Sequence, residues 1–162
     1  MSFMFLLWRV LPIPTAVRWL LVRAAHTRYL VAACALVFDA QGRLLLQRHT
    51  YRRRYAWGLP GGWLHGAEQA GDGLAREVNE ETGLRAEVGP LVRAVTGGSH
   101  RKVELIYSVR VTGSFRSSPE VSEAAYFGFD ELPTAIAPDT LAMITWAFAN
   151  RSAFLHNDDP GT

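Results

Sequence analysis

The chain has 162 residues, a length that suits a single domain, and its hydrophobic content of 49% is ordinary for a soluble globular protein. Its single cysteine, Cys34, excludes an internal disulfide framework and favours a reducing, cytoplasmic location. The formal net charge is only +2, yet residues 1–60 hold nine arginines against one acid, a net of +8, whereas residues 61–162 hold eight basic residues against fourteen acids, a net of −6.

Residues 1–27 form an apolar and basic extension, in which Pro12 and Pro14 break any continuous helix. Its longest uncharged apolar run is far shorter than the ~18–20 residues that span a bilayer, and it lacks the basic, apolar and small-residue order of a signal peptide. We weigh three interpretations, in falling order of preference: an extra helix packed on the domain, an arm that makes a homodimer, and a basic amphipathic segment that rests on a membrane surface.

Short apolar runs bounded by turn residues predict the next elements. Residues Tyr29–Phe38 form a run of strand length, in which we interpret Cys34 as a buried structural thiol. Asp39–Gly42 has the composition of a turn, and Arg43–Gln47 supplies a partner strand, so we expect a β-hairpin. A rigid, glycine-rich segment follows at residues 57–62.

The second half of the chain predicts three more strands and a closing helix. Val92–Val95 and Val103–Val111 read as strands that are separated by a turn at Gly97–Ser99, and Ala124–Phe129 reads as the last strand. The closing helix is expected at Thr140–Asn150. Three of its apolar residues fall at i, i+3 and i+7, which predicts one face on the core: Leu141, Ile144 and Phe148.

The last part of the chain has two further features. Trp146 points away from the apolar stripe of the closing helix and is a candidate to cover a second surface, such as the N-terminal extension. Residues 151–162 are expected to form a tail, and its last part, 157–162, is polar and without periodicity, so we expect it to be mobile.

Residues 62–84 carry the most informative pattern in the chain. On a helix, Glu77, Glu80 and Glu81 stand at i, i+3 and i+4 and therefore share a face. Three like charges at that spacing repel one another and raise each other's pKa unless a counter-charge is present. A hard divalent cation removes the conflict, because carboxylate oxygens are the ligands that Mg²⁺ and Mn²⁺ prefer. We therefore interpret the helix as a metal platform.

The same segment resembles the signature of the Nudix hydrolases, G-x5-E-x7-R-E-U-x-E-E-x-G-U, where U is a bulky aliphatic residue. All nine specified positions are met, by Gly62, Glu68, Arg76, Glu77, Val78, Glu80, Glu81, Gly83 and Leu84. The resemblance implies an α/β fold, a Nudix-type α/β/α sandwich with a mixed β-sheet, over about residues 28–150. It also implies that water attacks a phosphorus of a diphosphate with the help of Mg²⁺, or of Mn²⁺.

The resemblance also implies roles for single residues. Glu80 and Glu81 are similar to the principal metal ligands, and the carbonyl of Gly61 is similar to a backbone ligand. Glu77 corresponds to a further ligand or to the base for the attacking water. Arg76 corresponds to the arginine that positions the neighbouring glutamates, and Glu68 to a loop residue that braces them or reaches a second metal.

A fourth carboxylate ligand from outside the signature is common in the family. Two glutamates stand just before the last predicted strand, Glu120 and Glu123, and we prefer Glu120. The alternative is that both are surface charges and that water completes the metal shell.

A basic cluster precedes the glycine-rich segment and includes Arg48, Arg52 and Arg54. Arginine suits bidentate contact with phosphate, so part of this cluster is a candidate to grip the substrate, with Trp57 as a candidate to stack on a base. A solvated loop, or contact with the acidic half of the chain, is the alternative, and nucleic-acid binding is disfavoured. His65 and His100 are weaker candidates for contact with phosphate.

We expect a Mg²⁺-dependent pyrophosphohydrolase that cleaves the diphosphate of a nucleoside diphosphate linked to another group. A nucleoside triphosphate pyrophosphohydrolase that sanitises the nucleotide pool is the enzymatic alternative. A Nudix module that binds and senses a nucleotide without turnover is the alternative from another class, although such a sensor has no need to retain its glutamates. The residues that follow the signature do not identify the subfamily.

Overall fold

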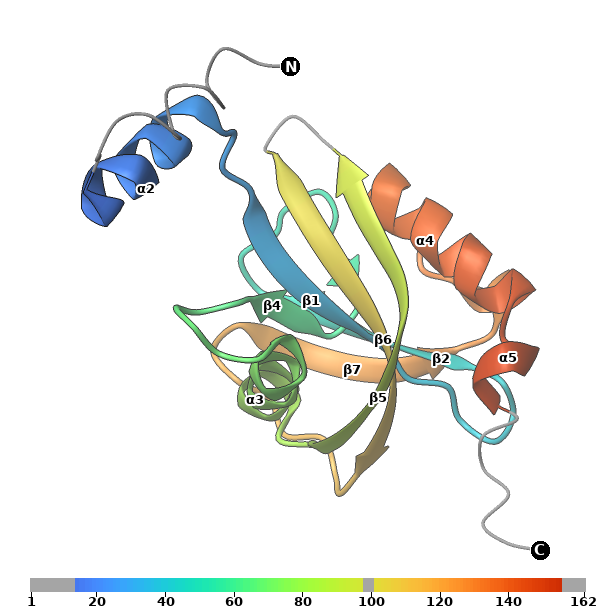
Figure 1. Ribbon diagram of the computed structural model, residues 1–162. Helices are drawn as coiled ribbons and strands as arrows, with labels where there is room; N and C mark the ends of the chain where they lie inside the picture. Colours follow the sequence, from blue (N-terminus) through green and yellow to red (C-terminus); the bar gives the residue numbers. More distant parts are fainter. Residues whose placement is uncertain (1–13, 98–100, 156–162) are drawn as a thin grey trace, which may run out of the picture.

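The computed structural model describes residues 14–97 and 101–155, in which two β-sheets lie between helices (Figure 1). The first sheet has the order β4-β1-β6-β5, with β1 at Leu30–Leu36, β4 at Gly61–Trp63, β5 at Arg85–Gly97 and β6 at Lys102–Thr112. Strands β1 and β6 run parallel, whereas β4 and β5 pair antiparallel with their neighbours, so the predicted mixed sheet is confirmed.

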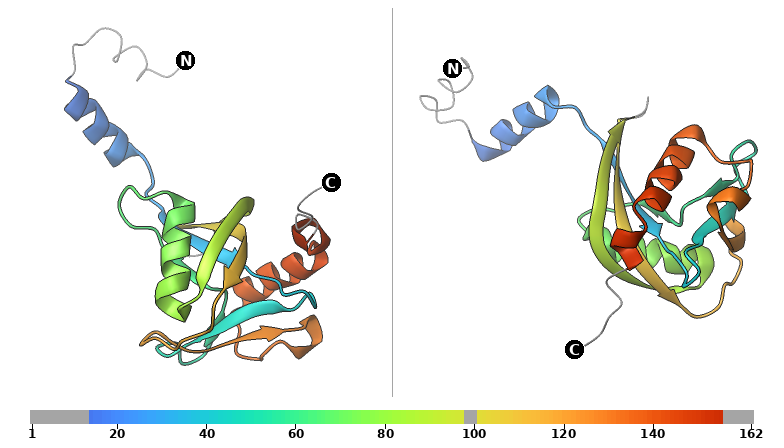
Figure 2. Two further views of the ribbon diagram at one scale, coloured as in Figure 1. Left: turned by 90° about the horizontal axis from the view of Figure 1, so that it is seen from below. Right: turned by 90° about the vertical axis from the view of Figure 1, so that its right-hand side faces the viewer.

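The second sheet is antiparallel and has the order β3-β2-β7, with β2 at Leu44–His49, β3 at Trp57–Gly58 and β7 at Val121–Phe127. Within the described residues, five helical segments accompany the sheets: α2 (Thr15–Ala25), α3 (Ala70–Thr82), the 3₁₀ helix η1 (Phe129–Glu131), α4 (Pro138–Ala149) and α5 (Ser152–Leu155). Helices α3 and α4 lie on opposite sides of the sheets (Figure 2), which gives the predicted α/β/α arrangement.

Alternation along β1 produces the two halves of the core, because successive side chains of a strand point to opposite faces. Ala33 and Ala35 pack in a cluster with Leu74 and Val78 of α3. Leu36, on the other face, packs in a second cluster with α4. Leu74 and Val78 thus form the side of α3 that faces the sheet.

The expected hairpin between the first two strands is wrong beyond its turn. Asp39 closes the turn, since its carboxylate accepts hydrogen bonds from the backbone N–H groups of Gln41 (3.0 Å) and Arg43 (2.8 Å). A bridge joins Phe38 and Leu44, after which β1 and β2 diverge into different sheets. Strand β1 pairs with β4 and β6, and β2 pairs with β3 and β7, so the local turn does not decide the pairing.

The closing helix α4 is confirmed, but its predicted stripe is shifted. Leu141 is 42% exposed, whereas Met143 and Ala147 are buried together with Ile144 and Phe148. The core face is therefore formed by two adjacent pairs spaced four residues apart. Such pairs lie on neighbouring ridges of a helix.

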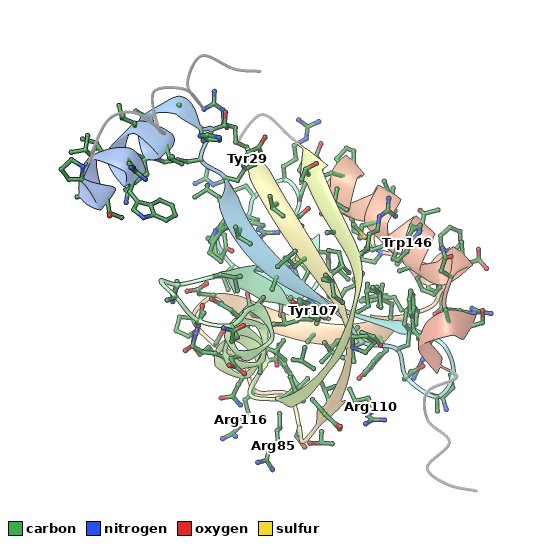
Figure 3. The ribbon with its side chains drawn as sticks, viewed as in Figure 1. Tyr29, Arg85, Tyr107, Arg110, Arg116 and Trp146 are labelled. Atoms are coloured by element: carbon green, nitrogen blue, oxygen red, sulfur yellow. The ribbon has the colours of Figure 1, made fainter. Side chains whose placement is uncertain are left out.

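Trp146 does not cover helix α2, the described helical part of the N-terminal extension. Its ring lies beneath the guanidinium of Arg93 on β5, whose Cζ is 4.5 Å from the ring centroid, and beside Phe154 of α5 at 5.8 Å between centroids. Figure 3 places Trp146 on the far side of the first sheet from α2.

Helix α2 does not fit the preferred interpretation of a helix packed on the domain. None of its residues is buried, and it projects away from the sheets in every view (Figures 1 and 2). The predicted turn at 97–99 and the predicted mobile end at 157–162 fall wholly or mostly outside the described residues. No helix in the described parts of the chain is long and apolar enough to cross a membrane.

Candidate functional site

The site is built where β4 meets helix α3, and two glycines make the close approach. Gly61 has φ +134°, and a Cβ there would lie 2.2 Å from the carbonyl oxygen of Ala33 on the neighbouring strand. A Cβ on Gly62 would lie 2.5 Å from the carboxylate of Glu77. The absence of a side chain at Gly62 therefore lets the signature helix lie against β4, and the absence of one at Gly61 lets β4 lie close to β1.

A third glycine ends the helix after its acidic turn. Gly83 adopts the left-handed conformation, with φ +70°, and its N–H donates to the carbonyl of Asn79 at 2.8 Å. This is the usual way to end a helix, because glycine has no Cβ to strain in that region. Glu77, Glu80 and Glu81 therefore lie in the last two turns of α3, just before this end.

Arg76 is the counter-charge for the acidic cluster. Its Nη1 donates to Glu77 Oε1 at 2.9 Å and to Glu80 Oε2 at 3.1 Å, and its Nη2 donates to Glu68 Oε1 at 3.0 Å. Hydrogen bonds from Arg76 and from the backbone of His65 lower the pKa of Glu68 below its ordinary value. Glu68 and Glu77 in turn raise the pKa of Arg76, and the charged guanidinium holds three glutamates together.

Glu81 is the one signature glutamate that Arg76 does not hold. Its side chain points inward and is only 6% exposed, and its Oε2 accepts a hydrogen bond from the N–H of Gly61 at 3.0 Å. Burial raises the pKa of Glu81 from 4.5 to about 7, and the nearby charges of Glu77 and Glu120 act in the same direction. Negative charge at this buried position is therefore costly, and no ion pair within the described residues offsets the cost.

These groups line one cavity of about 520 Å³, within the usual size range of small-molecule sites. Six carboxylates line it: Glu77, Glu80, Glu81, Glu104, Glu120 and Asp139. The cationic residues Arg52 and Lys102 also line the cavity, as do Gly61 and His65. Glu120 comes from the far end of the chain, where its carbonyl accepts a hydrogen bond from the N–H of Thr50 at 2.9 Å.

The basic cluster divides between cavity and solvent. Arg52 lies at the cavity beside Gly58, where a Cβ would be 3.2 Å from its Nη1. Arg48 is exposed on β2, opposite Trp57 and Glu123 in the strand register, and Arg54 lies over the ring of Tyr55 at 5.1 Å. The lining of the cavity includes neither Arg48 nor Arg54, because the chain turns between them.

Two further candidates lie apart from the cavity. Trp57 packs edge-on against Phe127, with 5.0 Å between ring centroids, on the side of the core that α4 covers. Glu123 is exposed on β7 and does not line the cavity, unlike Glu120. His100 falls outside the described residues.

The sequence interpretation missed two features of the cavity wall. Lys102 and Glu104 form an ion pair of 2.7 Å there, on the strand face that also carries Ile106. The sequence did hold a signal for this wall. The two charged residues and the apolar residue are spaced two positions apart, which places all three on one face of a strand. Cys34, expected as a buried structural thiol, is half-buried on the same wall. Burial raises its pKa to about 12, so the thiol stays protonated.

The donor chemistry of the cavity fits a hard divalent cation. Its carboxylates offer oxygen ligands only, and the raised pKa of Glu81 marks the place where additional positive charge is missing. No three histidine, cysteine or acidic side chains of the described residues are already gathered as a metal site. The cause is visible in the hydrogen bonds, since Arg76 holds Glu77 and Glu80 while Gly61 holds Glu81.

Comparison with known proteins agrees with this architecture. The NUDIX domain matches residues 28–147. A MutT-like protein of Streptomyces ambofaciens is 33% identical over 108 residues, which cover 66% of this chain and 69% of that protein. A MutT NUDIX hydrolase from Burkholderia pseudomallei has a TM-score of 0.65 at 24% identity, over 74% of this chain and 98% of the other.

A second solved structure supports the same assignment. An ADP-ribose pyrophosphatase from Streptococcus suis has a TM-score of 0.61 at 25% identity, over 74% of this chain and 92% of the other. The domain match covers well over half of the chain and includes the complete signature helix. The chain therefore belongs to the Nudix family and is a hydrolase that acts on phosphoanhydride bonds.

Proposed function

We propose that the chain is a Mg²⁺-dependent pyrophosphohydrolase that cleaves the diphosphate of a nucleoside diphosphate linked to another group. The observation that carries the proposal is the meeting of Glu77, Glu80, Glu81 and Glu120 with Arg52 in one cavity. Carboxylates bind the cation and an arginine binds phosphate, so a diphosphate finds both kinds of partner there. The named substrate of the Streptococcus suis neighbour, ADP-ribose, belongs to this substrate class.

Each acidic residue has a distinct part in the proposal. Glu80 and Glu81 are the principal ligands of Mg²⁺ or Mn²⁺, Glu120 adds a ligand from the other sheet, and the carbonyl of Gly61 adds a backbone ligand. When bound, the cation would neutralise the diphosphate oxygens and acidify a water molecule. Glu77 is either a further ligand or the group that takes a proton from the attacking water.

Two arginines complete the proposed site: Arg76 positions the glutamates, and Arg52 neutralises charge on the substrate. Arg76 fixes the directions of Glu77 and Glu80 through hydrogen bonds of 2.9 and 3.1 Å. Because it also holds Glu68, it keeps the loop before the helix in place. Arg52 binds a phosphate oxygen of the substrate from the opposite side of the cavity.

Product analysis tests this proposal. Purified protein is incubated with Mg²⁺ and a set of nucleotide sugars, dinucleotides and nucleoside triphosphates, and the products are identified by mass. The expected result is a nucleoside monophosphate and a phosphorylated second group. Release of inorganic diphosphate from a triphosphate would move the chain to the triphosphate class, and absence of any cleavage would reject catalysis.

A further inference from the structure

Helix α2 presents an apolar face that no part of the described chain covers. Val17, Leu20 and Leu21 stand at i, i+3 and i+4, so they share one side of the helix, and Ala24 continues it. Their exposed fractions are 43%, 66% and 50%. A helix that served only to complete the domain would turn this face toward the sheets.

The apolar surface continues beyond the helix. Tyr29 and Leu30, at the start of β1, are both more than half exposed. Figure 3 shows Tyr29 at the end of the first sheet from which α2 projects. Trp63, opposite Ala32 in the register of β4 and β1, is also exposed. Aromatic side chains of this kind favour the boundary between water and lipid.

Three exposed arginines border the α2 end of this surface. Arg23 lies in the last turn of α2, and Arg28 follows in the connection to β1. Arg101 joins them, because its carbonyl accepts a hydrogen bond from the N–H of Leu30 at 2.9 Å. In the described part of the chain none of these three exposed arginines forms an ion pair. The sequence contains no acidic residue before Asp39.

The charge pattern decides which partner fits. Two copies that met symmetrically through α2 would place these arginines against a segment that contains no acidic residue, so they would find no counter-charge there. An anionic bilayer supplies the opposite charge and accepts leucine and aromatic side chains at the depth of its headgroups. We propose that α2 and the adjoining end of the first sheet, with Leu20, Leu21, Arg23, Arg28 and Tyr29, dock on an anionic lipid surface.

Vesicle sedimentation of the full chain tests this proposal. Vesicles of phosphatidylcholine alone are compared with vesicles that also contain phosphatidylglycerol. We expect binding only to the anionic vesicles, and less of it as salt is added. The double variant R23Q/R28Q should lower the partition coefficient about 25-fold, since each basic residue near an anionic surface contributes about fivefold. The variant L20A/L21A should lower it more than about tenfold and keep the helix, because alanine is a good helix former.

A matched pair of arginines provides the control. Arg85 and Arg116 are exposed at the opposite end of the molecule (Figure 3), so R85Q/R116Q should change partitioning by less than about twofold. Circular dichroism and unchanged nucleotide hydrolysis would show that all three variants fold.

Four results would overturn the lipid assignment. The first is absence of binding to anionic vesicles. The second is an equal loss in both arginine pairs, which would indicate unspecific attraction. The third is undiminished binding of L20A/L21A, which would indicate contact through charge alone. The fourth is a dimer in analytical ultracentrifugation that L20A/L21A abolishes, which would assign the face to a second copy.

Discussion

Replacing Glu81 by glutamine should stabilise the metal-free protein although it removes hydrolysis. The carboxyl is 6% exposed, and burial raises its pKa from 4.5 to about 7. A shift of this size, at about 1.36 kcal/mol for each pKa unit, corresponds to a penalty of about 3 kcal/mol for keeping the charged form folded. Glutamine has nearly the same size and can still accept the hydrogen bond from the N–H of Gly61.

The sign follows from proton binding. The folded-state pKa of Glu81 lies above the unfolded value, so the folded chain binds more protons between pH 4.5 and about 7. Stability of the wild type therefore falls as pH rises through this window, and the whole penalty is present above it. The variant lacks the penalty, so its advantage should be nearly complete at about pH 8 and mostly gone at about pH 5.

Thermal unfolding in the presence of a chelator measures this difference. At about pH 8 the variant should unfold roughly 6–12 °C above the wild type, given about 2–4 °C for each kcal/mol in a chain of this size. E80Q is the matched control, because Glu80 lies on the same helix but is exposed and paired with Arg76, and its melting temperature should change little. A variant E81Q that is less stable than the wild type, or whose advantage does not depend on pH, would refute the reasoning.

Three further substitutions test the cavity. R52Q should raise KM about tenfold or more with a smaller change in kcat, whereas R54Q, which alters an arginine outside the cavity lining, should leave KM unchanged; equal KM values in steady-state assays would remove Arg52 from phosphate binding. E120Q should lower kcat at least about tenfold and E123Q less than about twofold, and similar small effects would reject Glu120 as a ligand. G62A should lower kcat more than about tenfold, because its Cβ would lie 2.5 Å from a signature carboxylate; full activity would contradict that contact.

The helix of the signature could be predicted well because its information is local. The spacing of Glu77, Glu80 and Glu81 places them near one another whatever the rest of the chain does. The spacing alone does not show, however, that the three glutamates bind different partners. Arg76 forms hydrogen bonds with Glu77 and Glu80, whereas Glu81 turns inward and binds the backbone of Gly61. Strand β4 supplies Gly61, which stands twenty positions earlier in the chain.

Features that depend on distant partners were harder to predict. Tyr29–Phe38 and Arg43–Gln47 have the pattern of a hairpin, yet β1 pairs with β6 and β2 with β7, from much later in the chain. The basic cluster contains several arginines with the same chemistry. Only the path of the folded chain places Arg52, and not Arg48, at the cavity. Lys102 was missed for the same reason, because β6 reaches the cavity through its pairing with β1.

The central claim is that one turn of α3 holds a divalent cation beside a diphosphate. Electron paramagnetic resonance of free Mn²⁺ tests it directly, since bound Mn²⁺ loses its sharp signal. We expect the wild type to bind Mn²⁺, Mg²⁺ to displace it, and the double variant E80Q/E81Q to lose most of the affinity while it stays folded. Equal Mn²⁺ affinity in the wild type and the double variant would contradict the account.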